Sequence, residues 1–486
     1  MVRFVVLSIC LLPIFCFSQN ENDLYRHSKT SYHGSARFEA MGGSFGALGA
    51  DLSSYQINPA GYGRYSSSQF GASIFGGGSS TKSTFNSVLT KASSGQGGIS
   101  NLGFVIANDV SENGNGFLFN QFGLGYNQIE SFKNEIRYEG QQFSSLLDNF
   151  VSQIQGYYPE ELNTYFPFSS DLAYQTHTIK YDAVNQEFYS QLNAGDVYHS
   201  REIFTKGGIN EFYFNLSGNY LNKLYIGGNL SIRSYRYIED YKHSETLVDT
   251  SGTDLRGFDY NYYLKTKGNG VNLRFGAIYL ANESLRFGLA LHSPTFSEMT
   301  DTWSAGMSSR FTNANYTVVD SLIPVGDYKY KVRTPARVVG SVAFVFGTKG
   351  CLNVDVEYLS YRHAHFKSTS DLKYEAYNYE YENDYAKSVF QDALNVRIGG
   401  EYVLFAGCFL RGGFAYYGNA FNSDQQIELE PDMIISGGIG FKTKKFTLDL
   451  TYRQRTNTTT YYAFSNSLTT IANSTGNVVI SGIINF

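Results

Sequence analysis

The chain has 486 residues, a length that fits either two or three ordinary soluble domains or one large unit. Only 17% of the residues are charged, and 40 Tyr, 38 Phe and 49 Gly stand beside 8 Pro, a composition that favours strands and turns over helices. The formal net charge of -5 and the absence of any basic run argue against a nucleic-acid partner.

The first residues, MVRFVVLSICLLPIFCFSQN, have the pattern of a secretory signal peptide. Arg3 supplies the positive charge, residues 4–17 form the apolar core, and Cys16-Phe17-Ser18 is a small-x-small cleavage site. We therefore predict that residues 1–18 are a signal peptide that is removed after Ser18.

Cleavage leaves Cys351 and Cys408 as the cysteines of the exported chain. Two cysteines in so long a chain do not form a disulfide scaffold. They lie near predicted turns on strands two inter-strand steps apart, about 9.6 Å, which is beyond the reach of a disulfide. We expect both to be packing residues, and whether they touch stays open.

Residues 19–64 are rich in Gly, and they lead directly into an alternating segment that begins near Tyr65. Pro59 fixes its own φ and favours an extended conformation for Asn58. These residues predict an irregular segment that ends in a turn just before the first strand.

From Tyr65 onward, polar and apolar residues alternate with the period of two that marks a strand with unlike faces. In LYIGGNLSIRSY, Leu224 and Ile226 lie on one face, and Tyr225 and Asn229 lie on the other. The pattern predicts fourteen strands near residues 65–76, 98–109, 116–130, 209–221, 223–240, 262–281, 284–297, 328–346, 351–366, 385–404, 408–420, 431–442, 445–462 and 475–486.

Every second connection between these strands is short, and the others are longer, the longest running from Ser131 to Gly208. This is the pattern of an up-and-down membrane barrel with tight periplasmic turns and long outer loops. A Greek-key sandwich has no reason to produce it. We therefore predict an all-β, transmembrane, antiparallel barrel of about 14 strands.

The segment ARFEAMGGSFGALGADLSSYQINPAG, Ala36 to Gly61, resembles the N-terminal plug signature of the FadL/TodX-type outer-membrane transport proteins. Residues 270–296 and 334–347 fit the same family. The resemblance implies that residues 19–64 form a plug, or hatch, inside a barrel built by residues 65–486. The residues assigned to the plug are Met41, Gly42, Gly43, Asp51, Asn58, Pro59 and Ala60.

The resemblance also implies a function. Members of the family carry hydrophobic compounds, such as long-chain fatty acids or aromatic hydrocarbons, which bind near the outer loops and leave sideways into the bilayer. We therefore predict a channel in the bacterial outer membrane, without catalysis or a cofactor. Its expected partners are the lipid bilayer, a hydrophobic substrate and the outer-membrane assembly machinery, whose recognition signal the terminal Phe486 resembles.

Ten charged residues fall on the predicted lumen face of the strands. Two interpretations apply: they hold the plug through Arg37, Glu39 or Asp51 or bind a carboxylate, or they pair with one another, as polar lumen walls generally do. We favour the second. The ten are Arg233, Arg274, Arg286, Asp355, Glu357, Arg397, Glu401, Arg411, Asp449 and Arg453.

The longest outer connection contains QQFSSLLDNFVSQI, in which apolar residues recur at helical spacing. This predicts an amphipathic helix that either captures ligand at the barrel mouth or packs a lid onto the rim, and both interpretations stay open. The apolar residues are Phe143, Leu146, Leu147, Phe150, Val151 and Ile154.

Other functions have weaker support in the sequence. The residues 42–46 match the G-x-S-x-G nucleophile pattern, but no strand–turn–helix elbow is predicted there. His363 and His365 share a face, yet no third metal ligand is identified, so no metal site is predicted. The alternatives to uptake are a barrel that docks secreted proteins at the cell surface and a porin for polar solutes.

Overall fold

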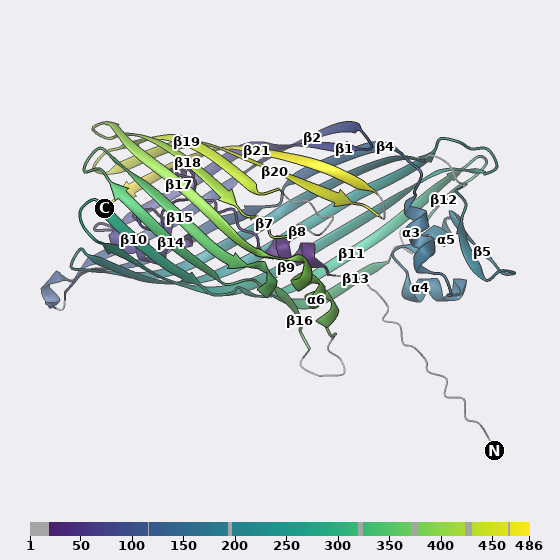
Figure 1. Ribbon diagram of the computed structural model, residues 1–486, viewed down its shortest axis with the longest axis horizontal. Helices are drawn as coiled ribbons and strands as arrows, with labels where there is room; N and C mark the ends of the chain where they lie inside the picture. The colour runs from purple at the N-terminus through teal and green to yellow at the C-terminus, as the bar shows by residue number, and fades with distance from the viewer. Residues whose placement is uncertain are drawn as a thin grey trace, which may run out of the picture.

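The computed structural model describes residues 19–486 except 115, 193–196, 319–323, 371–376, 423–429 and 465–466. The predicted signal peptide lies outside the described residues. Most of the described chain forms one antiparallel sheet that closes on itself (Figure 1). The closure is made by β1 (Gln69–Phe85) and β21 (Leu468–Asn485), which pair from Gln69–Asn485 to Phe85–Thr469.

The described strands build a closed barrel of 14 wall strands, so the predicted barrel class is confirmed. Four of the wall strands are interrupted and carry two labels each. Between β1 and β21 the wall consists of β2 (Val88–Asp109), β3 with β4 (Phe117–Ser131, Asn134–Gln142), β7 (Val197–Tyr220), β8 (Leu224–Leu247), β9 (Leu255–Leu280), β10 with β11 (Leu285–His292, Phe296–Phe311), β13 with β14 (Val325–Arg333, Arg337–Val345), β15 with β16 (Gly350–Ser360, His365–Ser368), β17 (Asp392–Phe405), β18 (Cys408–Tyr417), β19 (Asp432–Lys442) and β20 (Phe446–Tyr462).

The strands reach further outward than the sequence predicted. The expected loop between the first two strands is a tight turn at Asn86 and Ser87, and the expected connection 131–208 contains β4 and the start of β7. The prediction failed at these outer ends because both faces are polar above the membrane, so the alternation of apolar residues stops while the ladder continues.

β8 shows the two-faced wall that spans a bilayer. Leu230 and Ile232 point outward and expose 39% and 42% of their surface, whereas Asn229 and Ser231 are buried on the lumen side. In hydrocarbon no water is available for backbone groups, and a closed ladder satisfies all of them. Among the described residues, no helix is long and apolar enough to cross a membrane.

The longer connections gather at one end of the barrel, opposite the end where the C-terminus lies (Figure 1). One of them contains η4 (Pro159–Glu161), α3 (Leu146–Gln153), α4 (Leu162–Tyr165), α5 (Ser170–Gln175) and the hairpin of β5 (Ile179–Asp182) and β6 (Glu187–Ser190). We call this segment, residues 146–190, the lid. The other outer elements are β12 (Asn315–Thr317), η6 (Tyr361–His363) and α6 (Glu380–Val389), and η3 (Ser111–Asn113) lies at the opposite end.

The N-terminal segment folds inside the barrel, as the plug prediction required (Figure 1). It contains α1 (Glu21–Ser28), α2 (Ala36–Ala40), η1 (Ser54–Gln56) and η2 (Pro59–Arg64). Asn58 caps η2 in an extended conformation, with φ -146° and ψ 110°, as expected for a residue before proline. Its Nδ2 donates to the carbonyl of Gly46 (2.7 Å) and to that of Ala277 in β9 (3.0 Å).

Glycines on the lumen face of the wall allow the plug backbone to approach closely. A Cβ added at Gly413 of β18 would lie 2.1 Å from the nitrogen of Gly42, and one at Gly399 of β17 would lie 2.3 Å from the oxygen of Met41. Similar contacts occur at Gly227, Gly276 and Gly288. The plug therefore fits only because these wall positions carry no side chain.

We expect Gly413→Val to displace the plug, because the new side chain would overlap the backbone of Gly42 and Met41. The adjacent Gly412 is a matched control, since an added Cβ there meets nothing within 4 Å. In planar lipid bilayers, Gly413→Val is expected to raise ion conductance severalfold, and Gly412→Val to behave like the wild type. Equal conductance of the two variants would contradict this account of how the plug is seated.

Candidate functional site

The plug is joined to the wall by charged side chains buried in the lumen. Three ion pairs cross from plug to wall: Arg37–Glu401 (3.0 Å), Glu39–Arg453 (3.4 Å) and Lys29–Asp432 (2.8 Å). Pairs of this kind gain little net stability when they replace water, but a misplaced plug would leave charges unpaired. They therefore fix the position of the plug more than they stabilise it.

Asp355 of β15 binds the plug although no positively charged residue of the described plug pairs with it. Its carboxylate accepts hydrogen bonds from the backbone nitrogens of Phe45 (3.0 Å) and Gly46 (3.1 Å), which follow α2 in the plug. On the wall side, Arg397 lies 3.9 Å away from the same carboxylate. Asp355 therefore ties the turn after α2 to the wall through two backbone hydrogen bonds.

Most of the remaining predicted lumen charges form ion pairs with other lumen residues. Arg411 contacts both Glu401 (2.6 Å) and Asp449 (2.6 Å), and Arg397 contacts Glu357 (3.1 Å). Arg233 and Arg274 both bind Glu211 of β7, at 2.8 and 2.7 Å, a partner that the sequence analysis did not single out although it lies on a lumen face. Arg286 lies near the periplasmic end, and its Nε has no hydrogen-bond partner among the described residues.

Asp51 plays a different part from Arg37 and Glu39. Its carboxylate accepts hydrogen bonds from the Ser35 hydroxyl (2.8 Å) and the Ser53 nitrogen (2.8 Å), both inside the plug. It therefore organises the plug fold and contacts no wall cation among the described ion pairs. Gly42 and Gly43 have φ of 62° and 73°, a left-handed conformation that explains why this turn after α2 carries two glycines.

A cavity of about 370 Å³ lies between the plug and the wall, and we call it the inner cavity. Tyr25, Arg26 and Lys29 line it from α1. Phe132 and Lys133, the junction of β3 and β4, line it from the wall. Its volume lies within the range of about 300–1,000 Å³ that is usual for small-molecule sites.

Next to this junction the wall ladder is incomplete. β2 and β3 pair only from Asn101–Asn127 to Asp109–Phe119, while β4 pairs with β7 and turns toward β1. Within the described residues, no ladder pairing joins residues 88–100 of β2 to the β3–β4 side. We call this interruption the lateral gap. A smaller cavity of about 40 Å³, lined by Gln96 of β2 and by Ser131 and Lys133, joins it to the residues around the inner cavity.

One side-chain hydrogen bond crosses the lateral gap, and two others tie its two sides to β21. Gln96 accepts from the Ser131 hydroxyl (3.1 Å) and donates to Asn477 (3.0 Å), and Asn134 donates to Asn473 (3.1 Å). Gly95 of β2, which borders the gap, has only the Gly77 carbonyl oxygen, 4.0 Å away, near the place where a Cβ would lie. These side-chain bonds can break without disturbing any strand, so the wall can open locally at the lateral gap.

The predicted amphipathic helix exists as α3, and its apolar face is used for packing. Leu146, Leu147, Phe150 and Ile154 are buried in one cluster with residues of α5, β9 and β11, and Val151 packs against it. Phe143 is the exception: it precedes the helix and is 77% exposed. Phe143 lies outside the helix, because Ser145 caps α3 and β4 extends to Gln142.

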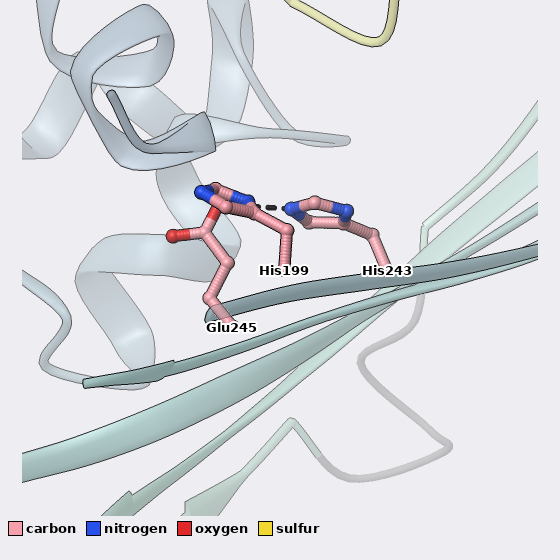
Figure 2. A group of neighbouring side chains, drawn as sticks. All are labelled: His199, His243 and Glu245. Atoms are coloured by element: carbon pink, nitrogen blue, oxygen red, sulfur yellow. Dashed lines mark hydrogen bonds and ion pairs between the residues drawn. The ribbon is translucent and has the colours of Figure 1, made fainter. Parts of the chain in front are cut away.

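The start of α3 is attached to the wall through a buried polar cluster, His199, His243 and Glu245, from β7 and β8 (Figure 2). Glu245 accepts from the Leu146 nitrogen (2.8 Å) and the Ser145 hydroxyl (2.5 Å), both at the N-terminus of α3. His243 Nε2 lies 2.8 Å from the same carboxylate, and His199 Nδ1 lies 3.4 Å from it. Glu245 therefore links the start of the lid to the barrel, beside the hydrogen bonds from Tyr260 to the Phe168 carbonyl (2.6 Å) and from Ser309 to the Thr176 carbonyl (2.6 Å).

Histidine and glutamate side chains are typical metal ligands, but here a hydrogen bond already fixes which ring nitrogen of His243 carries the proton. Arg201 donates its Nε–H to Nδ1 of His243 (3.2 Å), so Nε2 must carry the hydrogen and donate it to Glu245. A metal ion would need the Nε2 lone pair and would lie beside the Arg201 guanidinium. The geometry thus favours a hydrogen-bonded anchor, and it is the one such metal-type group within the described residues.

A second outer element rests directly on the plug. Tyr25 of α1 packs against Tyr361 and Phe421, with ring centroids 5.8 and 5.4 Å apart. The same apolar cluster includes Leu24 of α1 and Val389 of α6. Movement of this outer region would therefore displace α1, which also lines the inner cavity.

The motifs weighed for catalysis form no catalytic arrangement among the described residues. Ser44 donates its hydroxyl to the backbone carbonyls of Asn353 (3.1 Å) and Arg397 (3.2 Å), so it is a structural contact of the plug. His363 and His365 lie at the start of the outer connection, where His365 contacts the backbone of His363. Cys351 and Cys408 are both free thiols, as expected.

Comparisons with known proteins give a result only at the level of three-dimensional structure. No protein-family model matches the sequence, and no curated protein matches it. The Pseudomonas putida toluene transporter TodX superposes with a TM-score of 0.54 at 14% identity, over 93% of this chain and 98% of that one. A Pseudomonas aeruginosa FadL homologue superposes with a TM-score of 0.56 at 9% identity, over 94% and 99%.

This chain has the FadL/TodX-type fold. The resemblance first seen in the plug sequence is therefore confirmed in the arrangement of the whole barrel. At these identities the FadL/TodX-type likeness establishes the fold, and the function has to be argued from the lumen, the lateral gap and the lid.

We expect Glu245→Ala to loosen the lid, because it removes two hydrogen bonds to a carboxylate at the N-terminus of α3. Charged hydrogen bonds contribute about 2 kcal/mol, so the amides of α3 should exchange about 30-fold faster in hydrogen–deuterium exchange. Glu202→Ala is the control, since Glu202 is a half-exposed glutamate on β7 that pairs with Arg137. Unchanged exchange in Glu245→Ala would contradict this anchoring role.

The same anchor should weaken in acid. Burial, with Arg201 nearby, lowers the pKa of His243 from 6.5 to about 4. Burial alone would raise the pKa of Glu245, but His199 and His243 outweigh it and lower that pKa from 4.5 to about 2. Both groups bind protons more readily once the lid is undocked, so docking loses stability as the pH falls through these ranges.

Exchange of the α3 amides, corrected for intrinsic rates, is therefore expected to speed up between neutral pH and about pH 4, and Glu245→Ala should flatten that dependence. Equal protection at both pH values would contradict the assignment.

Proposed function

We propose that this protein is a bacterial outer-membrane channel that takes up hydrophobic compounds and releases them sideways into the bilayer. The observation that carries the proposal is the lateral gap, where an incomplete ladder lies beside the inner cavity. A release route through the wall suits an apolar solute, because the solute moves from protein to lipid without being dissolved in water.

The lid and the plug supply the steps before release. The lid covers the outer end of the lumen, and its apolar residues are packed together until a ligand competes for them. In the proposed sequence, a hydrophobic compound enters at the lid, the region around α6 moves with α1, and the inner cavity opens toward the lateral gap. The candidates for first capture are Leu146, Leu147, Phe150, Val151 and Ile154, with the exposed Phe143 at the rim.

Structural neighbours agree with the proposal in a general way. TodX is described as a toluene transporter and, in a mutant form that superposes with a TM-score of 0.57, as a monoaromatic hydrocarbon channel. Long-chain fatty acids and aromatic hydrocarbons are therefore the first substrates to test. The exported chain would reach the outer membrane through the assembly machinery, with the exposed terminal Phe486 as its recognition signal.

The test is uptake by cells that lack the protein and carry it on a plasmid. Gln96→Trp should fill the small cavity beside the lateral gap and lower uptake of labelled toluene or oleate at least severalfold, because Gln96 lines that cavity. Gln454→Trp is the matched control, since Gln454 of β20 bonds Ser474 and Tyr452 away from the gap. Folding of each variant is checked by heat-modifiable gel mobility.

The outcomes separate the candidate functions. Loss of hydrophobic uptake with unchanged polar-solute permeability supports the channel. Loss of proteins from the cell surface with intact uptake would replace it with the secretion-docking role. Steady ion conductance through the wild-type barrel would instead indicate a porin for polar solutes.

A further inference from the structure

A groove of about 340 Å³ opens on the outer surface of the wall, far from the lateral gap. It lies where β10 gives way to β11 and β14 to β13, on either side of the short breaks that contain Pro294 and Pro335. Ile232, Val271 and Phe296 form its apolar floor, and each is more than two-fifths exposed. The groove is thus an apolar recess on the face that the lipid covers.

Three cations stand at the upper side of this groove: Lys331 and Arg333 of β13 and Lys367 of β16. Lys331 and Lys367 are direct cross-strand partners, and the Arg333 guanidinium lies 5.6 Å from the Phe296 ring centroid. Four more outward-facing cations flank them: Arg236, Lys265, Lys267 and Lys329.

The seven cations outnumber the carboxylates beside them. Among the described residues no ion pair involves any of the seven; Glu298, the direct cross-strand partner of Lys331, lines the groove, and Asp327 lies above it. The cations repel one another, and the positive charge of Lys267 accordingly lowers the pKa of the Lys265 ammonium group. A chain with a net charge of -5 has therefore concentrated positive charge on one side of its barrel.

The height of the patch decides what it faces. On the outward side of β9, Phe275, Leu273 and Val271 are exposed apolar residues, and Asn269 and Lys267 follow them. Val271 is separated from the periplasmic turn by about 20 Å along the barrel axis, close to the top of an apolar band about 25 Å tall. The cations therefore stand at the level of the outer-leaflet headgroups.

We propose that this groove binds a phosphorylated glycolipid of the outer leaflet, with an acyl chain on Ile232, Val271 and Phe296 and a phosphate against Lys331, Arg333 and Lys367. An amphiphile with both parts matches the groove, whereas a neutral lipid leaves the cations unpaired and a free phosphate leaves the apolar floor uncovered. The site is independent of what the channel carries.

The experiment uses the full-length protein in detergent micelles, titrated with diphosphoryl lipid A and followed by native mass spectrometry. The triple variant Lys331→Gln/Arg333→Gln/Lys367→Gln should bind on the order of 100-fold more weakly, because each basic residue near an anionic lipid surface contributes about fivefold. The control Lys82→Gln/Lys91→Gln/Lys206→Gln removes three exposed cations from β1, β2 and β7 and should bind as the wild type does.

Two further arms test the two halves of the site. Val271→Trp fills the groove and should weaken lipid A binding without removing a charge. Dephosphorylated lipid A and phosphatidylcholine should bind the wild type weakly, and inorganic phosphate should not compete.

Equal losses in the two triple variants would overturn the proposal, since they would show non-specific attraction. Tight binding of phosphatidylcholine, or effective competition by inorganic phosphate, would overturn it as well.

Discussion

The structure depends on one constraint: a backbone that lies in hydrocarbon must satisfy its polar groups within itself. The closed ladder from β1 to β21 meets that constraint around most of the wall. Once the wall is closed, outward positions must be apolar and inward positions are free to be polar, which accounts for the alternation in every strand. The buried charges of the lumen and the irregular plug can exist only because this wall shields them from lipid.

The lateral gap is the place where the constraint is relaxed. Residues 88–100 of β2 have a strand partner on one side, and on the other side a side-chain bond, from Ser131 to Gln96, takes the place of a ladder. Glycines surround this stretch, so that little side-chain material fills it. A wall whose ladder is interrupted beside an internal cavity has a defined direction in which a solute can leave.

The plug and the lid are held by different kinds of contact. The plug is seated by wall glycines and by ion pairs such as Arg37–Glu401, which restrict its position closely. The lid is attached through an apolar cluster and hydrogen bonds to Glu245, Tyr260 and Ser309, with no ion pair to the wall among the described residues. Separately from the lid, α1 packs against the region of α6, so this part of the outer surface is in contact with an element that lines the inner cavity.

The sequence by itself determined the barrel, its approximate strand number and the turn before the first strand, because period-two alternation and the Asn58-Pro59 turn are local features written in consecutive residues. The plug was expected from the resemblance of Ala36 to Gly61 to the FadL/TodX-type plug signature. The sequence also placed Arg397 and its fellow charges on the lumen face. It could not assign partners such as Glu211 for Arg274, since a strand pattern fixes which face a side chain takes but not which residue stands opposite across the lumen.

Only the tertiary structure decided where the ladder fails, that the anchor of the lid is Glu245, and that cations from β13 and β16 meet beside an apolar groove. Each of these depends on the register between strands distant in sequence, and that register is set by the closure of the barrel as a whole.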